Sequence, residues 1–222
     1  MRGGYGIRVP RAADNDLMAS LTSLRQQAST CRNCELWREA TQTVFGEGSP
    51  RSRAVLVGEQ PGDAEDLAGR PFVGPAGRVL DEGLVEAGIE RDDVYVTNAV
   101  KHFKWRAQGK RRIHQRPNAS EIAACKPWLV GELDAIRPDV LVLLGATASQ
   151  ALLGRSFRVT KQRGEPIEET GLAPFVVATI HPSSVLRERD DDARAQARAG
   201  FVRDLVVVRE LLGRTSNRAA SD

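Results

Sequence analysis

The sequence predicts an α/β protein, a three-layer α/β/α sandwich around a central four-stranded parallel sheet. Four short runs rich in Val, Leu and Ile recur along the chain, and helix-like patterns fill the intervals between them. Runs of this length that are apolar almost throughout are typical of parallel strands that helices cover on both faces. A doubly wound sheet has this arrangement. The expected strands are residues 53–60, 92–99, 138–145 and 175–182.

Helices are expected before, between and after these strands, over residues 16–28, 77–87, 120–136, 146–153 and 193–212. A length of 222 residues with a hydrophobic fraction of 41% allows one substantial core, and no structureless spacer divides the chain. We therefore expect a single domain over residues 1–222. The composition of its two ends predicts flexible extensions at about 1–15 and 213–222.

The charge of the chain is informative in its distribution rather than in its total. The net charge is only +3, but residues 101–120 contain seven Lys or Arg and no Asp or Glu. Such a segment suits contact with a polyanion, and the alternative is a solvated basic loop. There is no cleavable leader and no apolar stretch of around 18 residues, so we expect a cytoplasmic protein that does not enter a membrane.

The basic segment also holds one of only three histidines, His114, in the run KRRIHQ at 110–115. Histidine contributes little fixed charge near neutral pH. It does contribute a nucleophile or a proton carrier. His114 is therefore a candidate for chemistry rather than for charge.

Polar side chains stand at the carboxyl ends of the expected strands. Glu59 follows the first strand, Asn98 ends the second and His181 ends the fourth. Ligands of open parallel sheets bind in the crevice outside these ends, so the three side chains should converge. Each could instead be a cap, a turn former or an ion-pair partner. No Gly-x-Gly-x-x-Gly or Walker-type loop is present, which disfavours a nucleotide cofactor.

The three cysteines form a pattern of their own. Cys31 and Cys34 make a Cys-x-x-Cys pair, and Cys125 lies far downstream at the start of an expected helix. In a cytosolic chain this pattern indicates a metal or cluster site or a redox pair, and the redox interpretation requires a preceding strand where this sequence has a helix. His102 is the candidate fourth ligand. The alternative is that His102 is only a surface residue.

The order of several motifs resembles the uracil-DNA glycosylase superfamily, in particular its iron–sulfur family-4 branch. The similarity spans roughly residues 31 to 212, and the motifs are GEQPG, GRPFVGPAGRVLD, VYVTNAVK, LLGATA and HPSS. The run KRRIHQ narrows the resemblance to the UdgX branch. In that branch an extra loop carries a histidine that becomes joined to DNA after uracil is released.

The resemblance implies an iron–sulfur cluster, of the 4Fe-4S type, held by Cys31, Cys34, His102 and Cys125. Ordinary family-4 members have a cysteine at the position of His102 and fewer residues before the equivalent of Cys125. The exchange of cysteine for histidine is part of the UdgX pattern. Zinc in a site of three cysteines and one histidine is the alternative cofactor.

The resemblance also implies a pocket for a flipped uracil. Phe72 is similar to the aromatic residue that stacks on the base, and Asn98 to the amide that reads its polar edge. Backbone amides near Gln60 and Asp63 would bind the carbonyl oxygens, and His181 is placed beside the base. The residues implied in DNA contact are Lys110, Arg111, Arg112, Ser183 and Ser184.

The implied reaction is excision of uracil from single- or double-stranded DNA by cleavage of the N-glycosidic bond. His114 would then attack C1′ in place of water and leave the protein, expected to be a monomer, covalently attached. Glu59 would polarise His114 or accept its proton, or stabilise the sugar cation. The alternatives are a conventional family-4 glycosylase with turnover and a non-catalytic uracil-DNA binding protein. An RNA-binding protein is a weaker alternative, since the aromatic content is 5%.

Overall fold

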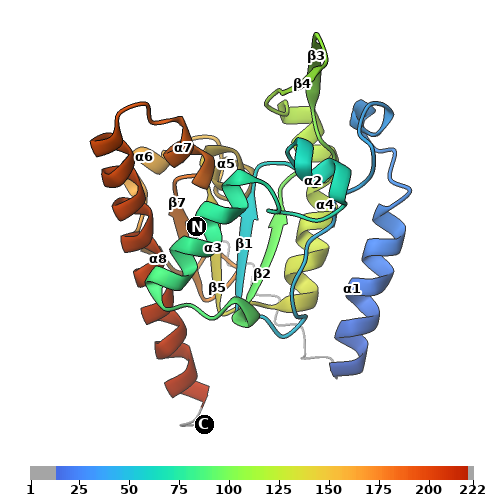
Figure 1. The fold of residues 1–222 in the computed structure, drawn as a ribbon. Helices are drawn as coiled ribbons and strands as arrows, with labels where there is room; N and C mark the ends of the chain where they lie inside the picture. The colour runs from blue at the N-terminus through green and yellow to red at the C-terminus, as the bar shows by residue number, and fades with distance from the viewer. Residues whose placement is uncertain (1–13, 220–222) are drawn as a thin grey trace.

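A computed structural model describes residues 14–219 and confirms the predicted α/β class (Figure 1). The sheet has the strand order β2-β1-β5-β7-β6. The four long strands are parallel and correspond to the four predicted ones, whereas the fifth strand is antiparallel to β7. The prediction of a four-stranded sheet was wrong because it lacked this short edge strand. Two residues are too few to produce a pattern in the sequence. The strands are β1 (Ala54–Gly58), β2 (Val94–Asn98), β5 (Val140–Leu144), β6 (Pro166–Ile167) and β7 (Phe175–Thr179).

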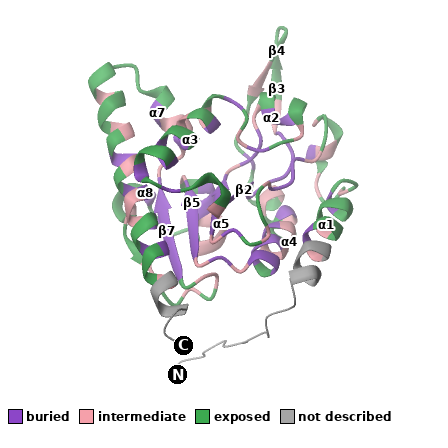
Figure 2. Ribbon diagram, turned by 60° about the horizontal axis from the view of Figure 1, so that its bottom comes forward, coloured by how far each residue is buried: buried purple, intermediate pink, exposed green. Residues whose placement is uncertain are grey.

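Helices cover both faces of the sheet, and the two cores arise from the alternation of side chains along each strand. In β1, Val55 and Val57 pack in one core with α1 (Asp14–Ala28), α4 (Ala119–Ile136) and α5 (Ala146–Leu153). Ala54 and Leu56 pack in the other with α3 (Pro75–Ala87) and α8 (Asp191–Ala219). Every residue of the long strands is buried. Figure 2 shows this for β5 and β7, which are purple. The continuous apolar runs are thus explained by burial on both sides.

The five predicted helices are present, with ends that differ by a few residues. The remaining helices are η1 (Glu35–Arg38), α2 (Asp63–Ala68), η2 (Arg91–Asp93), α6 (Val159–Gln162) and α7 (Pro182–Arg187). Three short α-helices, α2, α6 and α7, were not predicted.

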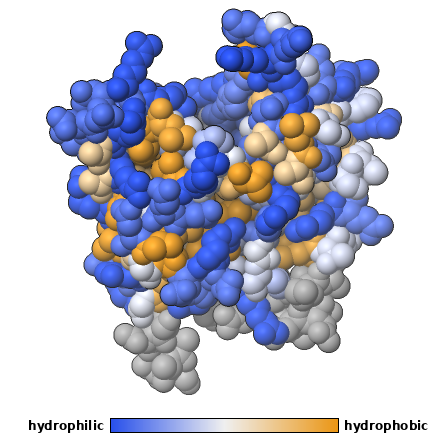
Figure 3. All heavy atoms as spheres, in the orientation of Figure 1, coloured by the Kyte–Doolittle hydropathy of each residue, from blue (hydrophilic) through white to orange (hydrophobic). Residues whose placement is uncertain are grey.

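The basic segment is a β-hairpin rather than an irregular loop. It consists of β3 (Trp105–Gln108) and β4 (Arg111–His114), joined by two residues of which Gly109 has φ 59°. Glycine is suited to this left-handed conformation in a two-residue turn. The hairpin projects above the carboxyl ends of the strands (Figure 1), and its surface is mostly hydrophilic (Figure 3). His114 is the last residue of β4 and therefore lies at the base of the hairpin.

The ends of the chain differ from the predicted extensions. Residues 213–219 continue α8 as a helix, while residues 1–13 and 220–222 of those extensions lie outside the described residues. Within the described part of the chain, no helix has the length and apolar character needed to cross a bilayer.

Candidate active site

The carboxyl ends of the parallel strands bring the predicted polar residues to one edge of the sheet. Gly58, at the end of β1, is paired with Asn98, at the end of β2, and Glu59 follows directly. On the other side, the amide of Gly145 donates to the carbonyl of Thr179 over 2.8 Å, which fixes the ends of β5 and β7 next to each other. His181 follows Thr179 by two residues. The convergence expected from the sequence is therefore present.

Gly58 lies in close contact with two of the predicted uracil-contacting residues, Asn98 and Phe72. A Cβ atom at this position would lie 2.4 Å from Oδ1 of Asn98 and 2.8 Å from Cζ of Phe72. Both distances are shorter than non-bonded contacts allow. Asn98 and Phe72 can therefore lie this close to the backbone of residue 58 only because that residue is glycine.

Phe72 is held in an unusual backbone conformation. Its φ is 56°, in the left-handed region, where a bulky residue costs about 1–2 kcal/mol. The start of α3 packs against its carbonyl so closely that a Cβ at Gly77 would lie 1.7 Å from that oxygen. The ring of Phe72 lies stacked at 6.2 Å from the ring of His181. Such strain is typical of positions that the surrounding structure fixes for function.

His181 is neutral, and its hydrogen bonds select one tautomer. Burial, together with the positive charge of Arg187, lowers the pKa of His181 to about 4. Its Nδ1 accepts from the Ser183 amide at 3.2 Å and lies 2.8 Å from the Ser183 hydroxyl. Because an amide can only donate, Nδ1 carries the lone pair and the proton is on Nε2. His181 therefore offers one N–H donor beside Phe72.

Glu59 and His114 face each other across the rim. His114 Nε2 lies 3.6 Å from Glu59 Oε1, and their side chains are 48% and 22% exposed. The other carboxylate oxygen, Oε2, accepts from the hydroxyl of Thr147 and lies 3.9 Å from Nε of Arg116. Sequence analysis predicted the first pair but not the participation of Thr147.

The imidazole of His114 is held in its neutral form. Partial burial lowers the pKa of His114 more than the negative charge of Glu59 raises it, and the charge of Arg187 lowers it further. The ring also lies 6.0 Å from the ring of Phe103. A neutral ring retains the lone pair that a nucleophile requires.

Gln60 fixes the base of the hairpin next to Glu59. Its amide nitrogen donates to the carbonyls of Lys104 and Gln115, at 3.2 and 3.0 Å, and its oxygen accepts from the amide of Lys104 at 3.2 Å. Lys104 and Gln115 are the residues on either side of the hairpin. A backbone amide near Gln60 is the predicted uracil contact, and its side chain instead holds the hairpin that carries His114 at the sheet rim.

Arg112 binds the hairpin to α2 through two ion pairs. Its guanidinium lies 2.5 Å from Oδ1 of Asp63 and 2.6 Å from Oδ2 of Asp66. It also lies over the rings of Phe103 and Trp105. Arg112 and Asp63, predicted at the DNA and uracil contacts, are thus bound to each other.

The other predicted DNA-contacting residues differ in how far they are engaged within the protein. Lys110 and Arg111 are exposed at the tip of the hairpin. Ser183 and Ser184 lie at the start of α7, and each hydroxyl lies 2.9 Å from the guanidinium of Arg187. Because a guanidinium only donates, both hydroxyls accept from it.

The three cysteines lie near enough to one another for Cys31 and Cys34 to affect the pKa of Cys125. Burial raises the pKa of Cys125 to about 11, and the neighbouring Cys34 and Cys31 thiols contribute to the increase. N–H groups donate to two of the sulfurs, from Lys101 to Cys125 at 3.2 Å and from Trp128 to Cys31 at 3.1 Å. Such donors stabilise thiolate ligands and cluster sulfur.

His102 is buried, and its pKa is lowered by burial. Its Nε2 lies 2.9 Å from the hydroxyl of Thr43, which itself donates to the carbonyl of Ala28. The Thr43 oxygen therefore accepts from Nε2, and the lone pair of His102 is on Nδ1. Among residues 14–219, no three His, Cys, Asp or Glu side chains are close enough to hold a single metal ion.

The family of this chain follows from its similarity to known proteins. The model of the uracil DNA glycosylase superfamily matches residues 45–206, which include the whole sheet rim described above. The chain belongs to the uracil-DNA glycosylase superfamily. It is 43% identical over 170 residues to the type-4 uracil-DNA glycosylase of Thermotoga maritima, covering 76% of this chain and 84% of the relative. It is 36% identical over 203 residues to the type-4 enzyme of Archaeoglobus fulgidus, covering 89% and 96%.

Two features of this superfamily member had no counterpart in the sequence analysis. Glu65 accepts from the amides of Gly62 and Gly74, at 3.0 and 2.9 Å, and so joins the loop after β1 to the loop that carries Phe72. Lys101 is buried and forms an ion pair with Glu132 beneath Asn98. Glu65 lies in the short helix α2 and Lys101 in the loop after β2, and a charged residue in either place gives no sequence signal of burial.

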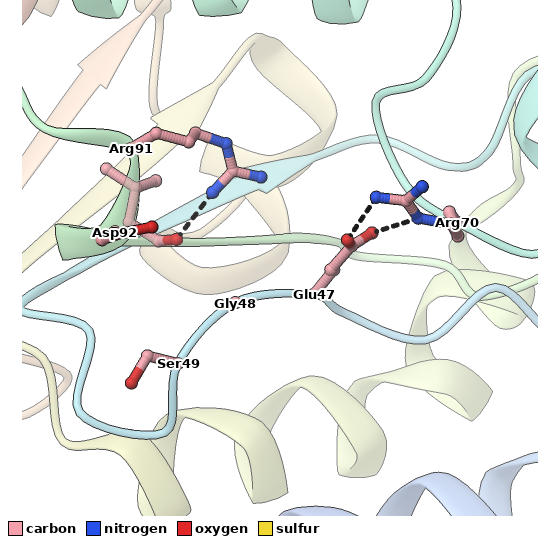
Figure 4. A pocket seen from close by; sticks show the side chains of 7 residues that line it. Glu47, Gly48, Ser49, Arg70, Arg91 and Asp92 are labelled. Atoms are coloured by element: carbon pink, nitrogen blue, oxygen red, sulfur yellow. Dashed lines mark hydrogen bonds and ion pairs between the residues drawn. The ribbon is translucent and has the colours of Figure 1, made fainter.

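A separate hollow of about 560 Å³ lies at the opposite end of β2, where Val94 begins the strand (Figure 4). Its wall includes the ion pair between Arg70 and Glu47, with a shortest distance of 2.6 Å. No residue predicted at the uracil, DNA or cluster sites lines this hollow. The hollow and the rim that carries Glu59 therefore lie at opposite ends of the sheet.

Proposed function

We propose that this chain excises uracil from DNA and then remains attached to C1′ of the sugar through His114. The superfamily match and the relatives named type-4 uracil-DNA glycosylases support the excision. The observation that carries the covalent step is the position of His114, whose Nε2 lies 3.6 Å from Oε1 of Glu59. A hairpin held by Gln60 and Arg112 brings it there.

Uracil recognition begins with flipping of the nucleotide, which costs roughly a few kcal/mol. The exposed Lys110 and Arg111, with the serines of α7, would contact the DNA backbone. In the pocket, the ring of Phe72 would stack on the base and the amide of Asn98 would read its polar edge. The Nε2–H of His181 would donate to a carbonyl oxygen and stabilise the charge of the departing base.

The chemical step is written as a substitution at C1′. The glycosidic bond breaks and its electron pair leaves with uracil, which takes a proton from water. A ring nitrogen of His114 gives its lone pair to C1′, and the resulting imidazolium loses its remaining N–H proton to solvent. The carboxylate of Glu59 stabilises the positive charge that passes from the sugar to the ring.

His114 competes with water because it is neutral and already in place. A positioned nucleophile has a high effective concentration, and a neutral imidazole is a better nucleophile than water. The new carbon–nitrogen bond has no good leaving group. Each protein molecule therefore excises only one uracil.

We also propose that Cys31, Cys34, His102 and Cys125 hold an iron–sulfur cluster, with His102 binding through Nδ1. The N–H donors to Cys31 and Cys125 suit the thiolate ligands of such a cluster. The cluster would link the segment after α1 to α4 and to the loop after β2. Its contribution is to fix that loop rather than to break the glycosidic bond.

A conventional glycosylase with turnover is the second candidate, since the relatives carry the name type-4 uracil-DNA glycosylase. In that case Glu59 would orient an attacking water molecule, which its 22% exposure permits. Protein mixed with excess uracil-containing single-stranded DNA separates the two. Trapping leaves one denaturant-resistant adduct per protein, whereas turnover produces many abasic sites.

The substitution His114→Ser tests the assignment of the nucleophile. The adduct should disappear in a denaturing gel, while free uracil can still be detected because water can replace the imidazole. The control is Gln108→Ser on the exposed part of the same hairpin, which should form the adduct as the wild type does. An adduct at wild-type yield in the His114→Ser protein would refute the assignment.

A further inference from the structure

Thr147 donates a hydrogen bond to the carboxylate of Glu59, and its own oxygen is engaged from the other side. Nε of Arg116 lies 3.1 Å from Oγ1 of Thr147. A guanidinium has only donors, so the Thr147 oxygen accepts this bond and its proton points to Oε2 of Glu59. Two hydrogen bonds therefore run in one direction: Arg116 donates to Thr147, and Thr147 donates to Glu59.

These hydrogen bonds give the two carboxylate oxygens of Glu59 different surroundings. Oε2 is held by Thr147, and Oε1 is left facing His114 at 3.6 Å. Glu59 comes directly after β1 and its side chain is partly exposed, so rotation would otherwise give it several positions. Because an error of about 1 Å in a reacting group can cost roughly 100-fold in rate, fixing this rotamer has kinetic value.

The helix that carries Thr147 does not need its hydroxyl. Thr147 is the second residue of α5, and the residue that caps this helix, Gly145, has no side chain. Ser149, on the same helix, uses its hydroxyl for a bond to the carbonyl of Gly145 at 2.8 Å. Both residues are buried, but only the hydroxyl of Thr147 is directed out of the helix toward the reaction centre.

We propose that Thr147 is a positioning residue that holds Glu59 in its reactive orientation, with Arg116 directing the hydroxyl proton. The proposal rests on the proposed role of Glu59 at C1′. It applies to cleavage of the glycosidic bond itself, whether His114 or water then attacks the sugar.

The experiment compares Thr147→Val, which has the same shape without the hydroxyl, with Thr147→Ser, which retains it. Under single-turnover conditions, Thr147→Val should release uracil roughly 10- to 100-fold more slowly, as expected for a lost hydrogen bond to a charged group. Thr147→Ser should remain within about threefold of the wild type, since its hydroxyl can make the same bond. Affinity for uracil-containing DNA should be similar in all three proteins.

Ser149→Ala is the matched control, because it removes a buried hydroxyl from the same helix without touching Glu59. It should release uracil at the wild-type rate. Thr147→Ala provides a second hydroxyl-free variant and should be as slow as Thr147→Val, with circular dichroism showing that both are folded. Equal rates for Thr147→Val and Thr147→Ser, or equal slowing by Ser149→Ala, would overturn the proposal.

Uracil release and adduct formation are measured separately, so this proposal and the covalent mechanism fail in different ways. A wild-type protein that releases uracil without an adduct would refute trapping by His114. The comparison of the Thr147 variants would still decide whether the hydroxyl acts on Glu59.

Discussion

Lys101 Nζ lies 2.5 Å from Oε2 of Glu132, and the two side chains are only 1% and 0% exposed. The pair is surrounded by further hydrogen bonds. Lys101 also donates to the hydroxyl of Thr97 at 2.6 Å and to the carbonyl of Asn98 at 2.8 Å, and Glu132 accepts from Tyr95 at 2.9 Å. A buried pair satisfied in this way ties α4 to the strand end that carries Asn98.

Removal of one partner should therefore be costly. We predict that Lys101→Met lowers the free energy of unfolding by about 3–5 kcal/mol, because it leaves the Glu132 carboxylate buried without a counter-charge. Urea denaturation followed by circular dichroism measures this loss. Lys161→Met, on the exposed surface of α6, should change stability by less than about 0.5 kcal/mol. Addition of Glu132→Gln to Lys101→Met should recover part of the loss, and a further loss would contradict this account.

The sequence predicts those parts of the site that follow from the topology of a parallel sheet. Glu59, Asn98 and His181 lie at strand ends, so the fold class alone places them at one edge. The hydrogen bond of Thr147 to Glu59 joins residues 88 positions apart. A partnership of that kind depends on side-chain directions, which periodicity does not specify.

The hairpin was missed for a different physical reason. It projects from the fold, so β3 and β4 have no fully buried face that would produce an alternating pattern of apolar residues. The dipeptide Gly109-Lys110 was the available signal, since a two-residue turn that begins with glycine is typical of hairpins. The sequence shows the basic charge of the segment, but charge alone does not distinguish Arg112, which is paired with Asp66, from its exposed neighbour Arg111.

Enlargement of Gly58 should damage the pocket. In Gly58→Ala the new methyl group would lie 2.4 Å from Oδ1 of Asn98, so the amide or Phe72 must move. We predict a loss of about 100-fold in the single-turnover rate of uracil release. Gly213→Ala on α8 is the control, because a Cβ there meets no atom within 4 Å. Wild-type activity in Gly58→Ala would show that this close approach has no part in uracil recognition.

The pH dependence of adduct formation should reflect two neutral imidazoles. The pKa of His114 is lowered, and that of His181 is lowered to about 4. The rate should therefore remain constant as the pH falls through about 6.5, where an ordinary histidine gains its proton, and decrease only at lower pH. Arg187 lowers both pKa values, so Arg187→Gln should move this decrease to higher pH. Arg187→Lys retains the charge and should leave the profile unchanged, and identical profiles for both variants would contradict the prediction.

Arg112 and Arg111 should have different effects although they are adjacent. Arg112→Ala releases the hairpin from Asp63 and Asp66, so adduct formation should slow by at least about tenfold at saturating DNA. Arg111→Ala should instead weaken DNA binding and reduce its salt dependence, with little change in the saturated rate. Rapid-quench kinetics and binding titrations at several salt concentrations measure the two effects. An equal loss of affinity without a change in rate would assign Arg112 to DNA contact after all.

The cofactor proposal predicts a coloured protein. Purified without chelators, it should contain iron and show broad absorption near roughly 400 nm, as expected for thiolate-ligated clusters. Cys125→Ala should lose both the iron and the colour, because it removes a buried ligand that the amide of Lys101 orients. His102→Cys should retain the colour, since thiolate is the usual ligand of such clusters, whereas His102→Ala should bind iron poorly. A colourless protein with one zinc ion per chain would refute the proposal of an iron–sulfur cluster.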